Sequence, residues 1–530
     1  MASTASSAPL HPDDHPQETA FEDIGDNDDA SEITTSSYES PARRALSDIE
    51  RRSYGSVQRS LSFKLPPATA SARAIAPDLV RGLLMAFMAI DHNTMALGAW
   101  QHGTGRVTEE DGAVVHQWNY RIAYAMRTLA HFCAPGFTFL LGMGIVYFGR
   151  SRTKLGWSAS RMVRHFLVRA VVLTLVSMAM GGIITRGAVW VFNIILIALA
   201  VDYFLVGVLW VGLSYTELAL ATVLSRWIPN EEAEAPLLVN NRDARFSEKP
   251  SSRAESISWM FHNMVLLVLT TVTIWWNMWM SPTHGYCLAE GAPEPKGSLF
   301  LRFWFYQVMT MRFPGIVSGF PPLAWISFAI LGVLYGRLIL RRSWSATTVA
   351  CANLAAALAF SVLFVLTRVL RFGNLSENCL QTSDQLAHPQ TNPYLVSVAS
   401  FFYVVKYPPD VAFFAFTLAG TFLLLAIFTA VPTSFATRYF RVLLVFGTSA
   451  LFFYVAHMFL LFAFGGILVA FFGHETDFKD PMGEGPGKGI DNVWVFFANW
   501  VAVLFVLYFA CKRYSAFKST KGPDSIWKFF

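Results

Sequence analysis

Ten apolar segments recur from residue 74 to the end of the sequence, and each is long enough to cross a bilayer. An α-helix rises about 1.5 Å per residue, so about 20 apolar residues span the ~30 Å hydrocarbon core. We expect helices at 76–98, 122–148, 164–185, 188–212, 258–280, 320–340, 345–370, 409–431, 442–472 and 491–511. The stretch 213–228 either extends the fourth helix, forms an eleventh span or lies at the interface. The sequence therefore predicts an all-α polytopic membrane protein with ten or eleven transmembrane helices.

The composition agrees with this class, because 54% hydrophobic and 15% charged residues give more apolar surface than one soluble core needs. The net charge of +5 does not indicate nucleic-acid binding, since the basic residues flank the apolar segments. Residues 1–72 lack apolar periodicity and are expected to form a disordered cytoplasmic tail. We expect a transmembrane domain over 73–515, with a cytoplasmic loop at 228–257, and a cytoplasmic C-terminal tail over 516–530.

Basic residues cluster in alternate loops, which predicts the orientation in the membrane. These residues are Arg43, Arg44, Arg51, Arg52, Arg59, Lys64, Arg73, Arg150, Arg152, Lys154, Arg161, Arg164, Arg341, Arg342, Arg438, Arg441, Lys512, Arg513, Lys518 and Lys521. Loops rich in Lys and Arg stay in the cytoplasm, so both termini are predicted to be cytoplasmic. The loops at 99–121, 281–319, 371–408 and 473–490 are then external or lumenal. The membrane is either the plasma membrane or an endomembrane such as the vacuole, lysosome or endoplasmic reticulum.

Two features of the predicted external loops fit that side of the membrane. The sequon Asn374-Leu-Ser376 predicts a glycosylation site at Asn374. Cys287 and Cys379 share the same oxidising side and are expected to form a disulfide. Cys133, Cys351 and Cys511 lie within helices, where we expect them to act as small packing residues.

Ionisable residues inside the apolar segments indicate where function resides, because such groups are costly in hydrocarbon. The first segment carries Asp91, His92 and Asn93, and the second carries Arg127 and His131. Counting the helical rise places His92, His131 and His457 at similar depth. By helical spacing, Arg127 shares a face with His131, and Tyr454 shares one with His457.

Other interpretations of these residues remain open. A single histidine in a membrane often only joins two helices by a hydrogen bond, and Asp202 is expected to make a structural polar contact. No His-x-x-x-His or Cys-x-x-Cys spacing supports a metal site, so we expect none. A carrier or channel is the alternative from another class, because buried charges can also form a proton or solute path.

Five motifs resemble a known family in order and spacing. They are Asp78-Leu-Val-Arg-Gly82, Met88-Ala-Ile-Asp91-His92, His131-Phe-Cys-Ala-Pro135-Gly, Lys406-Tyr407-Pro408-Pro409, and Leu444-Val-Phe-Gly447 followed by Tyr454-Val-Ala-His457. Together they resemble the catalytic domain of the heparan-alpha-glucosaminide N-acetyltransferase family, and in particular its bacterial-type branch of transmembrane acyltransferases. The resemblance covers about residues 73 to 530.

The resemblance implies transfer of an acetyl or acyl group from cytoplasmic acetyl-CoA or another acyl-CoA to an acceptor on the external side. The acceptor is an amino sugar or another amine or hydroxyl, and its identity stays open. Whether the protein forms a homodimer also stays open. As catalytic candidates we rank His131 and His92 first, then His102, which lies near the family's catalytic position, and then His457. Asp91 is expected to tune the base.

Other residues are assigned to binding. The acceptor-binding candidates are Arg127, Asn93, Tyr454, Lys406 and Tyr407. A cationic ring at the cytoplasmic mouth is expected to hold the coenzyme A phosphates; its members are Arg81, Arg150, Arg152 and Lys154. Topology alone is a competing explanation for the basic residues of the loops.

Overall fold

The computed structural model describes residues 75–100, 114–118, 121–228, 251–281, 298–305, 308–310, 315–479, 486–522, 525 and 527. The predicted tail at 1–72, most of the loop at 228–257, and His102 lie outside these residues. The longer helices are α2 (Ile75–Leu97), α4 (Cys133–Lys154), α5 (Ala159–Ile184), α6 (Leu196–Ser225), α7 (Ser252–Met280), α10 (Ala346–Val369), α13 (Val411–Ala430), α16 (Ala450–Phe472) and α17 (Val493–Ser519).

Shorter elements connect these helices. They are α3 (Arg121–Ala130), α8 (Leu299–Phe305), α9 (Ile326–Ile339), α11 (Ser383–Ala387), α12 (Val398–Phe402), α14 (Thr433–Tyr439), α15 (Arg441–Thr448), and the 3-10 turns η2 (Pro322–Ala324) and η3 (Pro393–Leu395). Strand β3 (Ile316–Ser318) pairs in parallel with β1 (Val191–Asn193) and antiparallel with β2 (Val308–Thr310). A second pair joins β4 (His474–Lys479) to β5 (Pro486–Gly489).

The predicted all-α polytopic membrane class is confirmed. Within the described residues, eight helical stretches are long and apolar enough to cross a membrane, and α9 is a shorter apolar helix. Helix α2 is not among the eight because Arg81, Asp91 and His92 lower its hydropathy. The number of crossings and the side of each terminus remain predictions.

Three of the predicted segments differ in detail from the structure. The stretch 213–228 mostly extends the fourth helix, since α6 runs unbroken to Ser225. The segment 122–148 is interrupted at His131 and Phe132, between α3 and α4, and the segment 442–472 is interrupted at Ser449, between α15 and α16. These interruptions were not visible in the hydropathy pattern, because the apolar character continues across both.

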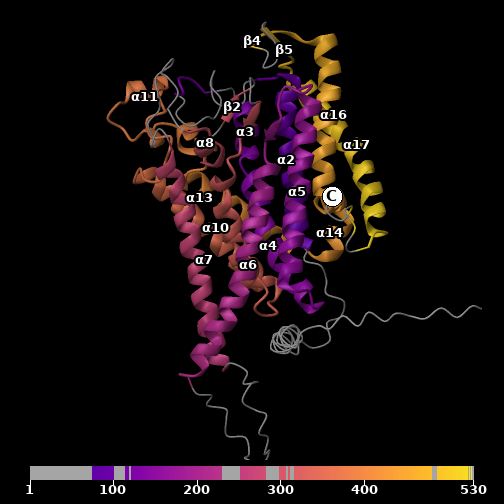
Figure 1. Cartoon of the computed structure of the whole chain (residues 1–530). Coiled ribbons are helices and arrows are strands. Elements are labelled where there is room, and N and C mark those ends of the chain that lie inside the picture. Colours follow the sequence, from indigo (N-terminus) through magenta and orange to yellow (C-terminus); the bar gives the residue numbers. More distant parts are fainter. Residues whose placement is uncertain are drawn as a thin grey trace, which may run out of the picture. The chain divides into compact units, whose positions relative to one another are not determined.

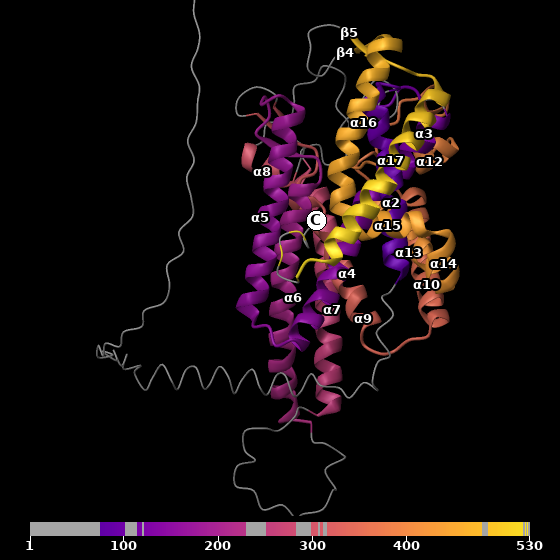
Figure 2. The same ribbon diagram turned by 90° about the vertical axis from the view of Figure 1, so that its right-hand side faces the viewer.

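Helix α2 packs against α15, α16 and α17, which lie around it in Figure 2, and also against α13, α4 and α3. Its contact with α15 depends on two glycines from separate sequence motifs. A Cβ at Gly82 would overlap the Leu443 carbonyl oxygen, and a Cβ at Gly447 would overlap that of Asp78. Small residues allow helix backbones to approach closely within membranes, where helix association depends on such packing.

The α6–α7 pair continues well below the neighbouring helices in Figure 1. Near the end of α9, Arg337 Nη2 donates to Glu217 of α6 at 2.6 Å, and Arg337 Nε donates to Asn263 of α7 at 2.8 Å. A charged pair that is also hydrogen-bonded can be buried at an acceptable cost. These contacts tie the three helices together at the predicted cytoplasmic side.

Candidate functional site

Two histidines from distant parts of the chain meet in the interior of the helical bundle. His92 Nδ1 on α2 and His457 Nε2 on α16 are 2.7 Å apart. The two rings are stacked, with centroids 5.0 Å apart and planes 18° apart. His92 is 7% exposed and His457 is fully buried. The prediction that these two residues lie at similar depth is therefore confirmed, and we call them the histidine pair.

The hydrogen bonds of His457 determine how protons are arranged in the neutral pair. Its Nδ1 lies 3.1 Å from the Phe453 carbonyl oxygen, which can only accept a hydrogen bond. His457 therefore carries its proton on Nδ1 and accepts on Nε2. His92 must then donate through Nδ1–H, which leaves the lone pair of its neutral ring on Nε2. A fixed tautomer of this kind prepares a histidine to act as a base.

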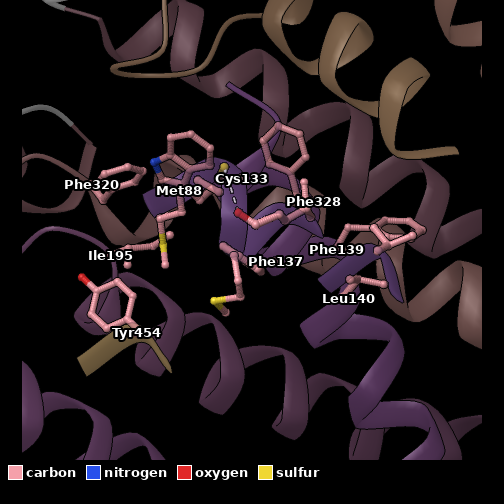
Figure 3. Close-up of a cluster of buried hydrophobic side chains, with 14 of the residues drawn as sticks. Met88, Cys133, Phe137, Phe139, Leu140, Ile195, Phe320, Phe328 and Tyr454 are labelled. Atoms are coloured by element: carbon pink, nitrogen blue, oxygen red, sulfur yellow. Dashed lines mark hydrogen bonds between the residues drawn. The ribbon is translucent and has the colours of Figure 1, made fainter. Parts of the chain in front are cut away.

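Tyr454 lies one turn before His457 and packs edge-on against it, with ring centroids 5.5 Å apart. The side chain is only 5% exposed. No residue in the described part of the chain forms a hydrogen bond with its hydroxyl. Figure 3 shows Tyr454 beside Ile195, near Met88 and Phe320, within a cluster of buried apolar side chains. A hydroxyl without a partner on a side chain that is 5% exposed is available to a small polar group.

A second group of predicted site residues gathers around the interruption between α3 and α4. The charges of Asp91 and Lys406 both lie close enough to Cys133 to interact with its thiol. The Lys406 ammonium lies 5.6 Å from the Phe320 ring centroid and 5.1 Å from that of Tyr407. These contacts bring α2, the segment before α13, and the start of α4 to one region.

His131 is buried at the interruption itself, and its ring packs edge-on against Phe413 at 5.4 Å. Arg127, one turn earlier, is also buried and lies over the rings of Tyr124 and Tyr403, at 5.8 and 5.0 Å. Both residues are thus held by aromatic side chains. Non-helical backbone at membrane depth is tolerated where it is enclosed by protein, as it is here.

Asn93 was predicted to bind the acceptor, but its side chain forms hydrogen bonds between two helices. Its Nδ2 donates to the Phe496 carbonyl oxygen at 2.8 Å, and its Oδ1 accepts from Asn499 Nδ2 at 2.7 Å. Both partners belong to α17, and Asn93 is fully buried. Asn93 therefore joins α2 to α17 in this structure, and the contacts that it makes here are structural.

The predicted cationic ring of Arg81, Arg150, Arg152 and Lys154 is also wrong as one site. Arg81 pairs with Asp78 at 2.7 Å and lies three residues from Leu84, whose carbonyl oxygen accepts from Cys133 Sγ at 3.4 Å. Arg150 lies seventeen residues beyond Cys133 on the continuous helix α4, about 25 Å at the helical rise. Measured along the axes of α2 and α4, the backbones of Arg81 and Arg150 are therefore roughly 15 Å or more apart.

The rest of that predicted ring has its own contacts. The Arg152 guanidinium lies over the Phe148 and Trp157 rings, at 5.1 and 4.9 Å, and Lys154 is exposed. Arg150 instead lies near Arg337 and Arg341, two residues that the sequence reasoning did not connect with it. No signal along the sequence links them, because they lie on different helices.

Asn374 belongs to a buried polar group that we call the Arg368 cluster, formed by Arg368, Asn374, Ser376, Tyr394 and Asp410. The Asn374 Nδ2 donates to the carbonyl oxygens of Thr367 at 2.9 Å and Phe372 at 3.1 Å. The residue is 5% exposed. A glycan on this nitrogen would replace one of its two N–H donors and would need space that the buried side chain lacks, so the fold disfavours the predicted glycosylation.

The remaining predictions have mixed outcomes. Cys379 is disulfide-bonded, whereas Cys133, Cys351 and Cys511 are free; Cys287 lies outside the described residues. Asp202 is fully buried, and within the described chain its carboxyl oxygens have no hydrogen-bond partner, which contradicts the expected structural contact. Among the residues that the structure describes, no group of three or more His, Cys, Asp or Glu side chains could hold a metal ion.

The arrangement can supply a base, a donor and nearby charges inside the bundle. The candidate base is His92, whose ring is hydrogen-bonded to His457, the candidate donor is the Tyr454 hydroxyl, and the charges are those of Asp91 and Lys406. No protein-family model matches this sequence, and no curated protein matches it significantly.

Proposed function

We propose that this membrane protein is an acyltransferase that moves an acyl group from acyl-CoA on the cytoplasmic side to an amine or hydroxyl on the other side. The observation that carries the proposal is the histidine pair, in which His457 fixes the tautomer of His92 deep within the helices. The resemblance of the five motifs supports the same reaction class, and all five contribute residues to the region around α2.

His92 is the general base in this reaction. As the acceptor nitrogen or oxygen attacks the thioester carbonyl carbon, its proton passes to His92 Nε2. The tetrahedral intermediate then collapses, the carbon–sulfur bond breaks, and the coenzyme A thiolate receives that proton. His457 Nε2 accepts the Nδ1–H of His92 throughout and stabilises the imidazolium that forms.

The Tyr454 hydroxyl is the donor to the oxyanion of the intermediate. It is buried near the histidine pair, and no described side chain competes for its proton. Preorganised donors of this kind are often the largest contribution to acyl-transfer catalysis. Asp91 and Lys406 provide opposite charges near Cys133, and these charges would orient an acceptor that has polar groups of its own.

A proton- or solute-conducting protein is the second candidate, because a hydrogen-bonded pair of histidines can also relay protons across a membrane. Acyl-CoA binding and consumption separate the two classes. A carrier or channel has no reason to release free coenzyme A thiol.

The test measures thiol release from acetyl-CoA by the purified protein, with a panel of amino sugars, simple amines and alcohols as acceptors. We expect His92→Gln to lower the turnover by about 10² to 10⁴, as loss of a general base does. His131→Ala tests the competing assignment of the base, and His388→Gln is the control because His388 is exposed and remote from the site residues. Full turnover in His92→Gln would contradict the mechanism, and no thiol release with any acceptor would favour the second candidate.

A further inference from the structure

Three arginines converge at the predicted cytoplasmic end of the bundle, away from the histidine pair. Arg150 lies near the end of α4, and Arg337 and Arg341 lie at and just beyond the end of α9. The Arg150 guanidinium donates to the carbonyl oxygen of Leu340, which caps the end of α9 and precedes Arg341, and the charges of Arg337, Arg341 and Glu217 act on it. Figure 2 shows α4, α6, α7 and α9 close together in this region. We call these residues the arginine cluster.

Each arginine is held in place by its own contacts. Arg337 is 8% exposed and bonds to Glu217 and Asn263. Arg341 Nη2 donates to Ser256 Oγ at 3.4 Å, and its guanidinium lies 4.9 Å from the Trp259 ring centroid. Arg150 is exposed and donates to the Leu340 carbonyl oxygen. The cluster therefore extends from the buried ion pair of Arg337 to the exposed guanidinium of Arg150.

Within the described chain, the charges that act on Arg150 are not balanced. They are two guanidinium groups and one carboxylate, and that carboxylate is already bonded to Arg337. Like charges repel, and the repulsion is stronger for partly buried groups than in bulk water. The preference for basic residues at cytoplasmic ends explains why arginines occur here. That preference does not explain why the three arginines lie close together, with contacts to four different helices.

We propose that the arginine cluster binds a phosphate group, supplied either by an anionic phospholipid headgroup or by a soluble phosphate ester such as coenzyme A. The planar guanidinium fork matches phosphate oxygens with paired charge-assisted hydrogen bonds. Arg150 and Arg341 contact the phosphate, and Arg337 is the positioning residue that holds α9 against α6 and α7. The α6–α7 pair extends beyond this level in Figure 1, at the end of the bundle where the basic residues predict the cytoplasmic headgroups.

This site does not depend on acyl transfer at the histidine pair. Arg150 is about 25 Å along α4 from Cys133, so a phosphate at the arginine cluster cannot contact the residues around His92 directly. A loss of phosphate binding and a loss of turnover are therefore separable outcomes. His92→Gln should leave phosphate binding intact.

The test uses the full-length protein in nanodiscs and two cluster variants, Arg150→Gln and Arg341→Gln. Arg342→Gln is the control, because Arg342 is exposed next in the chain and its guanidinium lies over the Trp344 ring, at 5.9 Å from the centroid. Affinities are measured for coenzyme A and inorganic phosphate in phosphatidylcholine discs, and for phosphatidylglycerol by titration into those discs. We expect the cluster variants to bind at least one probe about tenfold more weakly, and the control to stay within about twofold of wild type.

The three probes identify the source of the phosphate. If the cluster variants lose affinity only for phosphatidylglycerol, the ligand is a lipid headgroup. If they lose affinity only for coenzyme A, the ligand is the soluble ester. If they also lose affinity for inorganic phosphate, the site recognises the phosphate group that both share. Equal binding of every probe by wild type and cluster variants overturns the proposal. Should a Gln variant fail to fold, Arg150→Lys and Arg341→Lys keep the charge but lose the fork, and unchanged affinity in both would overturn it equally.

Discussion

The Arg368 cluster and the region around the histidine pair are both buried and polar, but their polar groups are bonded differently. In the Arg368 cluster, Nη1 of Arg368 donates to Asn374 and Nη2 to the Tyr403 carbonyl oxygen, each at 2.8 Å, while Nε has no partner within the described chain. Asp410 accepts from the backbone N–H groups of Leu375 at 2.9 Å and Phe413 at 2.6 Å. Beside the histidine pair, the Tyr454 hydroxyl has no partner among the described residues.

The difference shows which buried polar group is structural. A cluster whose charges each have several partners fixes the segments that carry it, and here it joins the end of α10 to the start of α13. A site that leaves a buried hydroxyl without a partner gains nothing in stability from that hydroxyl. Stability and function should therefore respond to different substitutions, and three predictions test this separation.

The largest expected effect is that of Arg368→Met. The guanidinium is fully buried, bonds to two partners and lies 4.4 Å from the Tyr394 ring centroid. Its removal leaves Asn374 Oδ1 without its donor and removes the positive charge that acts on buried Asp410, which costs about 3 to 5 kcal/mol for a buried ionic group. Thermal unfolding in detergent measures the loss. Arg371→Met is the matched control, since Arg371 is half-exposed in its ion pair with Glu377, and a surface pair contributes about 1 kcal/mol at most. Similar losses in both variants would contradict a structural role for the Arg368 cluster.

A smaller effect is expected from the ionisation of Asp410, which precedes the first residue of α13. Burial raises the pKa of this carboxyl from 3.8 to about 6, although the Arg368 charge and the backbone N–H groups act in the opposite direction. The folded protein therefore holds the proton more tightly than the unfolded chain does. This contribution to stability is complete below about pH 4 and is lost as the pH rises through 6.

The full contribution is roughly 3 kcal/mol, because one pKa unit corresponds to about 1.4 kcal/mol. Asp410→Asn keeps a good helix cap but cannot titrate. We expect the stability difference between the variant and wild type to change between pH 4.5 and pH 7, with wild type losing stability relative to the variant as the pH rises. A difference that stays constant over this range would show that Asp410 does not titrate there.

The smallest effect is expected from a matched pair of tyrosine substitutions. Tyr394→Phe removes the hydrogen bond between the Tyr394 hydroxyl and Ser376 Oγ, at 3.0 Å, and should cost about 1 kcal/mol. Tyr454→Phe removes a hydroxyl without a partner and should cost about 0 kcal/mol in stability, while lowering acyl transfer. Chemical denaturation of both variants measures the difference. An equal cost at the two positions would show that the two groups do not differ in bonding.

The apolar segments were predictable because bilayer thickness sets a minimum length that composition alone reveals. Counting residues from the helix ends also placed His92 and His457 at the same depth, and the structure joins them. Depth does not specify which face of a helix meets which neighbour. For that reason the sequence could not show that Asn93 faces α17, or that His131 packs against Phe413.

Local motifs failed where burial decides the outcome. The sequon at Asn374 describes three consecutive residues, whereas its amide bonds to Thr367 and Arg368 on the preceding helix. The basic residues of the loops likewise predicted which side of the membrane the loops lie on, but they did not predict which of these residues form a binding site together. Arg150 meets Arg337 and Arg341 only because α4 packs along α9, and that packing depends on surfaces that hydropathy does not describe.

The contact between Gly82 and Gly447 also limits how this sequence can change over evolutionary time. Each glycine faces a backbone carbonyl of the other helix, so a side chain at either position meets an atom that no rotamer change can move. A substitution at one position therefore cannot be compensated by a smaller residue at the other, since both are already the smallest. Related chains that keep α2 against α15 should carry glycine at both positions, and a chain with alanine at either one must hold these helices farther apart.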